Sequence, residues 1–466
     1  FIFYTFVIIQ LLNSFLKSLN YILNMEIIVI SIFVTGYLAI TLEHNLKIDK
    51  LIPALAMMAF LWAIIALWHL PVFDVNTTLK QLEPTHIDEI LLHHLGKTAE
   101  IIIFLLGAMT IVEIIDYFNG FFTIKTFIKT KSKIMLLWIF AALAFILSAI
   151  IDNLTATIVL ITILQKIVHD RDSRLWFAGL IIIAANAGGA WSPIGDVTTT
   201  MLWIGNKVTT LNLIGYLFLP SVVCVLVPVI IASCLPAFKG EISVNDNNDD
   251  VTSHPKGAIM LYLGLSAIVF VPFFKTMTHL PPYVGMMLSL AIVATFAEIF
   301  SNAKIHMSSI DLESDLHSSH SPVHSSLSKI ELPSILFFLG ILLSVAALES
   351  LGILFEFAES LNAVIPNTDI VVILFGFGSA VIDNVPLVAA SMGMFSELID
   401  DPLWHFIAFS AGTGGSMLII GSAAGVVAMG MEKIDFFWYL KNISWLALLG
   451  FLSGSASFIL LRNFIA

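Results

Sequence analysis

The sequence predicts an all-α polytopic membrane protein built from two inverted repeats. Of its 466 residues, 58% are hydrophobic and only 12% are charged, which is too apolar for a soluble domain of this length. Several apolar runs exceed about 18 residues, the length with which a helix crosses the hydrocarbon core. One polar phrase occurs twice inside these runs and predicts the repeat. Because the chain is so apolar, its expected partner is the lipid bilayer. No basic stretch interleaved with aromatic residues indicates nucleic acid.

The apolar segments form two series separated by a polar linker over 237–256. Residues 1–24 are expected to lie outside the core fold, as an N-terminal extension. The first membrane repeat is predicted over 25–236 and the second over 257–466, with a mobile Ser/His-rich loop over 301–331. The predicted segments are 25–43, 50–70, 97–118, 134–168, 174–208, 211–236, 257–275, 282–300, 332–351, 369–398, 403–431 and 436–462.

The repeated phrase lies midway in one apolar segment of each series. It runs Ser148-Ala-Ile-Ile-Asp152-Asn153 and, 231 residues later, Ser379-Ala-Val-Ile-Asp383-Asn384. A glycine-broken segment follows each copy. There the pair that begins at Gly188 matches the pair that begins at Gly414 at an offset of 226, which also sets Asp196 on Ser422. Such steady offsets indicate a duplicated unit.

Lysine and arginine placement predicts how the segments cross the membrane. The loop 119–133 and the connector 165–174 are both basic, so both are expected on the cytoplasmic side. The segment 134–168 then enters and returns as a re-entrant hairpin with Asp152 at its tip. The segment 369–398 has acidic flanks and is expected to enter from the opposite side. Each repeat then has about five crossings plus one hairpin and one broken helix, and an odd number of crossings inverts the second repeat.

Polar groups at hairpin tips and helix breaks predict a cation site. Unpaired backbone carbonyls there are tolerated beside a polar cavity, and with Asn and Thr oxygens they form a shell suited to a small cation. We expect a small cation at Asp152, Asn153 and Asp196, with a carboxylate exchanging a proton for the cation. The further candidates along the ion path are Thr155, Asn186, Ser192, Thr198, Thr199, Asp383, Asn384, Ser416 and Ser422.

Each candidate also has a structural interpretation. Asp152 and Asp383 are suited to cap the helices of their hairpins, and serine and threonine hydroxyls often bond to backbone carbonyls within a helix. Two buried aspartates are also typical of an intramembrane aspartyl protease. The inverted repeat and the Asn that follows each Asp argue against that enzyme class, so we expect no catalytic residues and no enzymatic activity.

The sequence resembles the NhaD-type sodium:proton antiporters of the ion transporter superfamily, from about Met25 to the C-terminus. The resemblance is carried by Asp152-Asn-Leu-Thr-Ala-Thr and Gly188-Gly-Ala-Trp-Ser-Pro-Ile-Gly-Asp196, together with Leu42-Glu-His44, His93-His-Leu-Gly-Lys-Thr-Ala-Glu100 and Ser410-Ala-Gly-Thr-Gly-Gly-Ser416.

This resemblance implies exchange of cytoplasmic Na⁺ or Li⁺ for external protons, and hence Na⁺ at Asp152, Asn153 and Asp196. We expect a bacterial inner membrane and no cofactor. The resemblance adds His93 and Glu100 as contributing ionisable groups, and it implies a homodimer, as in related transporters. In the second hairpin Pro386 stands where the first has Thr155, so the two tips are not expected to be chemical copies.

The alternative within the same superfamily is a Na⁺-coupled symporter of an anion such as citrate or a dicarboxylate, or an arsenite transporter. An anion requires donors and, commonly, a cationic side chain. Apart from Lys207 at an edge, neither Lys nor Arg occurs in the hairpins and breaks. This favours a cationic substrate.

Overall fold

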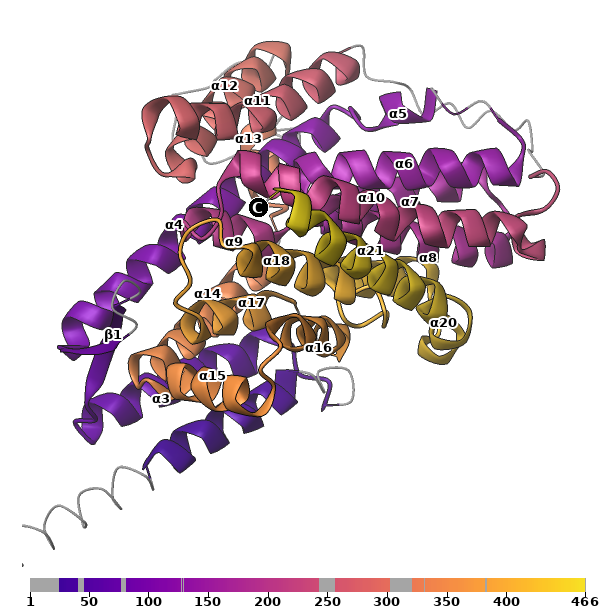
Figure 1. Cartoon of the computed structure of the whole chain (residues 1–466). Helices are drawn as coiled ribbons and strands as arrows, with labels where there is room; N and C mark the ends of the chain where they lie inside the picture. The colour runs from indigo at the N-terminus through magenta and orange to yellow at the C-terminus, as the bar shows by residue number, and fades with distance from the viewer. Residues whose placement is uncertain are drawn as a thin grey trace, which may run out of the picture. The chain divides into compact units, whose positions relative to one another are not determined.

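The structure is a computed structural model that describes residues 25–40, 46–76, 81–126, 128, 130–242, 256–301, 321–330, 332–381 and 384–465. Nearly all of them are helical (Figure 1). Among the described helices, eight are long and apolar enough to cross a membrane. The predicted class, an all-α polytopic membrane protein, is therefore confirmed. The predicted N-terminal extension, residues 1–24, lies outside the described residues.

The chain forms two compact units. The first comprises residues 1–98, 332–366 and 389–396, and the second comprises 99–331, 367–388 and 397–466. Each unit thus takes segments from both predicted repeats. The division of the chain into repeats at 236–257 stays a prediction.

In the first unit, helix α3 packs against α14. Trp62 of α3 donates its indole N–H to the backbone oxygen of Leu343 at 2.8 Å. A Cβ at Gly340 would lie 2.8 Å from the backbone carbon of Ala54, so the two helices need a glycine at this crossing. The elements of this unit are the helix Met25–Ile40, α3 (Leu51–Leu67), β1 (Val72–Asn76), β2 (Gln81–Thr85), the first turns of α4 (Ile87–Tyr117), α14 (Leu332–Ser350) and α15 (Ile353–Val364).

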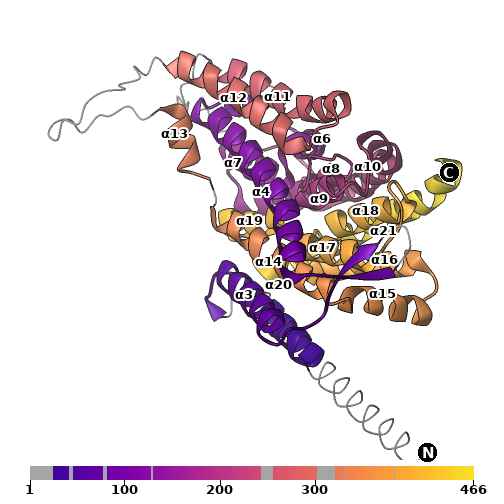
Figure 2. The same ribbon diagram turned by 90° about the vertical axis from the view of Figure 1, so that its left-hand side faces the viewer.

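The second unit holds the hairpins and the broken helices. α6 packs against α8, α16 against α18, and α10 against α21 (Figure 1). α11 lies beside α12 in both ribbon views (Figures 1 and 2). Besides the rest of α4, its elements are α5 (Phe122–Thr126), α6 (Lys133–Ile151), α7 (Asn153–Ile167), α8 (Arg171–Ala190), α9 (Val197–Ile204), α10 (Thr210–Cys234), η1 (Pro236–Phe238), α11 (Gly257–Thr278), α12 (Pro282–Ser301), α13 (Pro322–Leu327), α16 (Thr368–Val381), α17 (Asn384–Met394, continuing into the first unit), α18 (Pro402–Gly414), α19 (Ala423–Glu432), α20 (Phe436–Asn442) and α21 (Ser444–Ile465).

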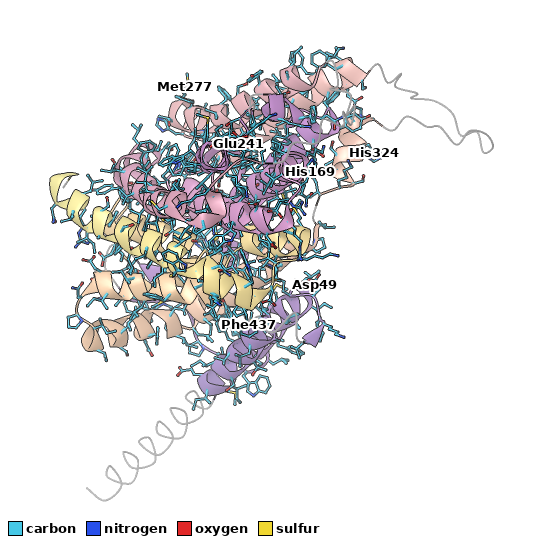
Figure 3. All side chains as sticks on the ribbon, turned by 90° about the vertical axis from the view of Figure 1, so that its right-hand side faces the viewer. Asp49, His169, Glu241, Met277, His324 and Phe437 are labelled. Atoms are coloured by element: carbon cyan, nitrogen blue, oxygen red, sulfur yellow. The ribbon has the colours of Figure 1, made fainter. Side chains whose placement is uncertain are left out.

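In the first hairpin, α7 runs back towards the N-terminal end of α6. Lys133, the first residue of α6, donates its Nζ to Ser173 Oγ in the first turn of α8, at 2.7 Å. His169 lies in the short, exposed connection between α7 and α8 (Figure 3). The start of α6 and the end of α7 therefore lie at the same end of the hairpin, whose turn falls at Asp152.

The described elements differ from the predicted segments in three places. α4 begins at Ile87, well before the predicted start at 97, with Asp88 and Glu89 in its first turn, where carboxylates favour a helix N-terminus. The strands β1 and β2 form an antiparallel hairpin in a stretch without a predicted segment. Each strand has only five residues, several of them polar, so the sequence shows no alternating hydrophobic pattern typical of a strand. The segment 436–462 contains two helices, α20 and α21, which meet at Ile443.

The predicted loop 301–331 contains a helix in its described part. α13 begins at Pro322 because proline is favoured at the first helical position, and the hydroxyl of Ser321 accepts from the backbone N–H of His324. Figure 3 labels His324 on this helix. The expectation of a mobile loop was therefore wrong for 322–327. Residues 302–320 and 331 lie outside the described residues.

Candidate functional site

Asp152 forms the tip of the first hairpin and caps the helix that follows. Its φ of +85° lies in the left-handed region, which is rare for a residue with a side chain and is concentrated at functional sites. Its Oδ1 accepts from the backbone N–H of Thr155 at 2.8 Å, and its Oδ2 accepts from Thr155 Oγ1 at 2.9 Å. The capping interpretation of Asp152 is therefore observed, and it fixes both Asp152 and Thr155 at the tip.

The first hairpin, through α6, and the predicted second hairpin, through α16, are attached to the following broken helices by the same hydrogen bond. Ser148 Oγ donates to the backbone oxygen of Ala185, and Ser379 Oγ donates to that of Ala411, both at 2.6 Å. The two serines differ by 231 positions and the two alanines by 226, the offsets that the sequence predicts. All four residues are buried.

The same offsets recur in the closest backbone approaches. A Cβ at Gly188 would collide with the backbone oxygen of Phe145, and a Cβ at Gly414 would collide with that of Gly376. Only glycine allows the broken helix to lie this close to the hairpin. The glycines of the two breaks are therefore required by packing, and they set α8 on α6 and α18 on α16 in the same way.

Asp196 and Ser422 begin the helices after the two breaks, in nearly identical backbone conformations. Their φ and ψ values are −147° and 150° for Asp196, and −147° and 152° for Ser422. Both side chains are 2% exposed. Ser422 caps its own helix by accepting from the backbone N–H of Gly425 at 3.2 Å. The carboxylate of Asp196 does not cap α9; its Oδ2 accepts from Asn384 Nδ2 at 3.0 Å.

Side-chain amides connect the hairpin tips to the breaks. Asn153 Nδ2 donates to Asn186 Oδ1 at 3.1 Å, and Asn186 Nδ2 donates to Ser422 Oγ at 2.9 Å. Asn384, at the second tip, bonds to Asp196 in the first half of the chain. All five residues are buried. Residues from both predicted repeats thus form two buried hydrogen-bonded groups, Asn153–Asn186–Ser422 and Asn384–Asp196. The second group contains a carboxylate, which is the donor chemistry of a small hard cation.

The remaining hydroxyl candidates divide into two groups. Thr199 Oγ1 donates to Asp196 O at 2.9 Å and Ser416 Oγ to Thr413 O at 2.6 Å, while Ser192 Oγ accepts from the N–H of Ile194 at 3.4 Å. These bonds are local and structural. Thr198 Oγ1 is buried and has no hydrogen-bond partner within the described part of the chain.

Three ionisable candidates remain. Asp383 lies outside the described residues. His93 and Glu100 lie on α4, and no hydrogen bond among the described residues joins either of them to Asn153, Asn186 or Asp196. No group of three or more His, Cys, Asp or Glu side chains in the described ranges is arranged to hold a metal ion. A cation here would depend on amide, hydroxyl and backbone oxygens around the carboxylate.

The sequence interpretation missed Lys275, a cation within the apolar helix α11. Its Nζ donates to the backbone oxygen of Trp203 at 2.9 Å and lies 4.5 Å from the centroid of the Trp203 ring. Lys275 therefore satisfies a carbonyl at the C-terminal end of α9, where positive charge is favourable. The sequence does contain a signal for this contact, because a lysine inside an otherwise apolar segment needs a partner.

Apolar helices of membrane length, together with a buried polar hairpin tip and buried polar helix breaks, define a membrane transport protein. A family described as "Citrate transporter" matches residues 37–405. The chain is 43% identical to sodium/proton antiporter 1 of Arabidopsis thaliana, over 94% of this chain and 73% of the relative. The chain belongs to this transporter family and, within it, to the NhaD-type sodium/proton antiporters.

Other known proteins agree with this assignment. The chain is 39% identical to sodium/proton antiporter 2 of Arabidopsis thaliana, over 93% of this chain and 99% of the relative. It is 32% identical to the Na⁺/H⁺ antiporter NhaD of Vibrio cholerae, over 93% and 91%. The crystal structure of the Alcanivorax borkumensis YdaH transporter is similar with a TM-score of 0.51 at 12% identity, over 89% of this chain and 97% of that one. That likeness concerns the fold alone.

Proposed function

We propose that the protein exchanges Na⁺, and also Li⁺, for protons across the membrane by alternating access. The relatives named as sodium/proton antiporters support this activity. The observation that carries the proposal is the carboxylate of Asp196, which is 2% exposed and bound by Asn384 from the opposite hairpin tip. Burial makes the charge of a carboxylate costly, and either a proton or a bound cation removes that cost. Proton and Na⁺ therefore compete for one group, which is the requirement for antiport.

The cycle follows from this competition. With the site open to the cytoplasm, ionised Asp196 binds Na⁺ among the oxygens at the hairpin tips and helix breaks. After the site has turned outward, an external proton neutralises the carboxylate and releases Na⁺. Asp152 places a second negative charge at the first tip, where Thr155 holds it. The hairpins and broken helices move as one assembly, because Ser148 and Ser379 attach each hairpin to its helix.

Three finer assignments belong to this proposal. The two repeats are inverted across the membrane; the matching contacts at the two hairpins support the duplication. The native assembly is a homodimer. The membrane is a bacterial inner membrane, as the match to the Vibrio cholerae relative supports, although two relatives of higher identity come from a plant.

The experiment uses proteoliposomes with an inside-acid pH gradient and a pH-sensitive dye. NaCl, LiCl, KCl and sodium citrate are added in turn. Collapse of the gradient on addition of Na⁺ or Li⁺ is expected, and Asp196→Asn should abolish it while the purified variant remains monodisperse. The matched control is Asp172→Asn, the same substitution at an exposed position in the first turn of α8.

The citrate-transporter description of the family makes a sodium-coupled citrate symporter the competing outcome. Sodium-dependent citrate uptake without any response to NaCl or LiCl would replace the antiport proposal. The position of Lys207 disfavours that outcome, because its Nζ lies over the ring of Trp404, 4.4 Å from the centroid, on the connection after α9.

A further inference from the structure

One position beside the buried carboxylate differs between the two broken helices. The offset that relates Ala185 to Ala411 relates Asn186 of α8 to Gly412 of α18. Both residues are buried. The first copy therefore has a side-chain amide at this position, whereas the second copy has no side chain.

In the first copy, the amide of Asn186 occupies the acceptor capacity of Ser422. A serine oxygen has two lone pairs. At Ser422 Oγ, one accepts from Asn186 Nδ2 at 2.9 Å and the other accepts from the backbone N–H of Gly425 at 3.2 Å. Asn186 itself is held by Asn153, which donates to its Oδ1 at 3.1 Å. The Ser422 hydroxyl is thus saturated with donors and has no lone pair for a cation.

In the second copy, the absence of a side chain leaves space directly against the carboxylate. A Cβ at Gly412 would lie 3.4 Å from Asp196 Oδ2 and 3.4 Å from the Cβ of Ala190. Asn384 Nδ2 reaches the same Oδ2 directly, at 3.0 Å, without an intervening amide. A carboxylate has about four acceptor sites and a full charge, so it binds a cation far better than a serine oxygen does.

We propose that Asn186 and Gly412 make the two related positions unequal, so that the protein binds a single Na⁺, beside Asp196 and over Gly412. This inference rests on the proposed Na⁺/H⁺ exchange. At the Ser422 break, the N–H of Asn186 presents positive charge to the oxygen and replaces the cation. Gly412 is consequently a specificity-determining residue: a side chain there narrows the space beside the carboxylate, and the smaller Li⁺ tolerates that narrowing better than Na⁺ does.

The first test is Gly412→Ala in the proteoliposome exchange assay. A Cβ at 3.4 Å from its neighbours is an ordinary contact, so the variant is expected to fold. Its KM for Na⁺ should rise roughly tenfold, which corresponds to about 1.4 kcal/mol, and its KM for Li⁺ should rise less. The matched control is Gly430→Ala on α19, whose Cβ meets nothing within 4 Å and which should leave both values unchanged. Wild-type KM values of Gly412→Ala for both ions would overturn the inference.

The second test needs no variant. Equilibrium binding of radioactive sodium to the purified protein should saturate at one ion per chain, and saturation at two per chain would contradict a single site. The two proposals fail in different ways. A wild-type protein that exchanges neither Na⁺ nor Li⁺ refutes the proposed function. Normal wild-type exchange with unaltered Gly412→Ala kinetics refutes only the inference drawn from Gly412.

Discussion

Arg174 and Glu432 form an ion pair between the first turn of α8 and the last residue of α19. Arg174 Nε lies 2.9 Å from Glu432 Oε2 and 3.1 Å from Oε1, and the glutamate side chain is 2% exposed. The same guanidinium donates from its Nη1 to the backbone oxygens of Val168 and His169. The pair therefore attaches the end of the first hairpin and the start of α8 to the helix after the second break.

Breaking this pair on one side should be costly. Arg174→Met leaves Glu432 buried without its partner, and we expect a loss of about 3–5 kcal/mol in stability, measured as a lower melting temperature in detergent. The double variant Arg174→Met/Glu432→Met should recover much of the loss, because no uncompensated charge remains. Lys441→Ala, at an exposed position on α20, is the control. A double variant less stable than either single variant would contradict this account.

Asp152→Asn should separate the charge of Asp152 from its capping role. Asparagine caps a helix about as well as aspartate and tolerates a positive φ, so the hydrogen bond from the N–H of Thr155 is kept. We expect near-normal stability and loss of Na⁺/H⁺ exchange in proteoliposomes.

Asp152→Ala gives the converse measurement at the same position. It removes the cap and should cost about 1 kcal/mol of stability. If Asp152→Asn exchanged at the wild-type rate, the carboxylate at the tip would be a structural cap only.

Gly188→Ala and Gly414→Ala should be equally harmful. In each case the new Cβ collides with a backbone oxygen of the hairpin, which cannot move aside as a flexible side chain can. We expect losses of about 1–3 kcal/mol or more, seen as reduced yield and melting temperature. The control is Gly215→Ala in α10, where the Cβ meets nothing within 4 Å and should stabilise the helix by about 0.5–1 kcal/mol. A tolerated Gly414→Ala would disprove the close approach of α18 to α16.

Asp170 should give the start of α8 a measurable pH dependence. Its Oδ2 accepts from the backbone N–H of Ser173 at 3.0 Å, and the hydrogen bonds of Ser173 hold the pKa of Asp170 below its usual range. Because the folded pKa is the lower one, the stabilisation is complete above the unfolded pKa of about 4 and is lost as the pH falls through the folded value. Asp170→Asn keeps the cap without the charge, so its melting temperature should fall less between about pH 5 and pH 3. Parallel melting curves of the two proteins over that range would contradict this role.

The sequence predicted the first tip and the two breaks well, because polar residues within apolar segments are expensive and therefore conspicuous. Ser148, Asn153, Asn186 and Asp196 lie in contacts that join hairpin residues to broken helices, and Ser422 lies in a contact between the two broken helices. The offsets of 231 and 226 reappear in one pair of equal hydrogen bonds, from Ser148 to Ala185 and from Ser379 to Ala411. Local chemistry and spacing were sufficient for this much.

Three features depended on tertiary geometry and could not be predicted. The sequence treats Asp152 and Asp196 alike. With its φ of +85°, Asp152 caps the helix that follows it, α7. The backbone of Asp196 is extended, and its carboxylate accepts from Asn384 instead. The partner of Lys275 lies 72 positions away in the chain. The mixing of both sequence halves within each compact unit results from packing between segments distant in sequence, such as α3 and α14.

The hydrogen bonds of Ser148 and Ser379 allow the two halves of the chain to be compared by equivalent substitutions. Ser148 and Ser379 make the same bond, at the same length, to the same type of acceptor. A purely mechanical contribution must therefore be the same at both, and Ser148→Ala and Ser379→Ala should lower stability equally. Any difference between the two variants in sodium affinity or turnover then reports how unequally the two halves share the transport work. The stability change in the two serine variants thus serves as the reference against which their difference in transport is measured.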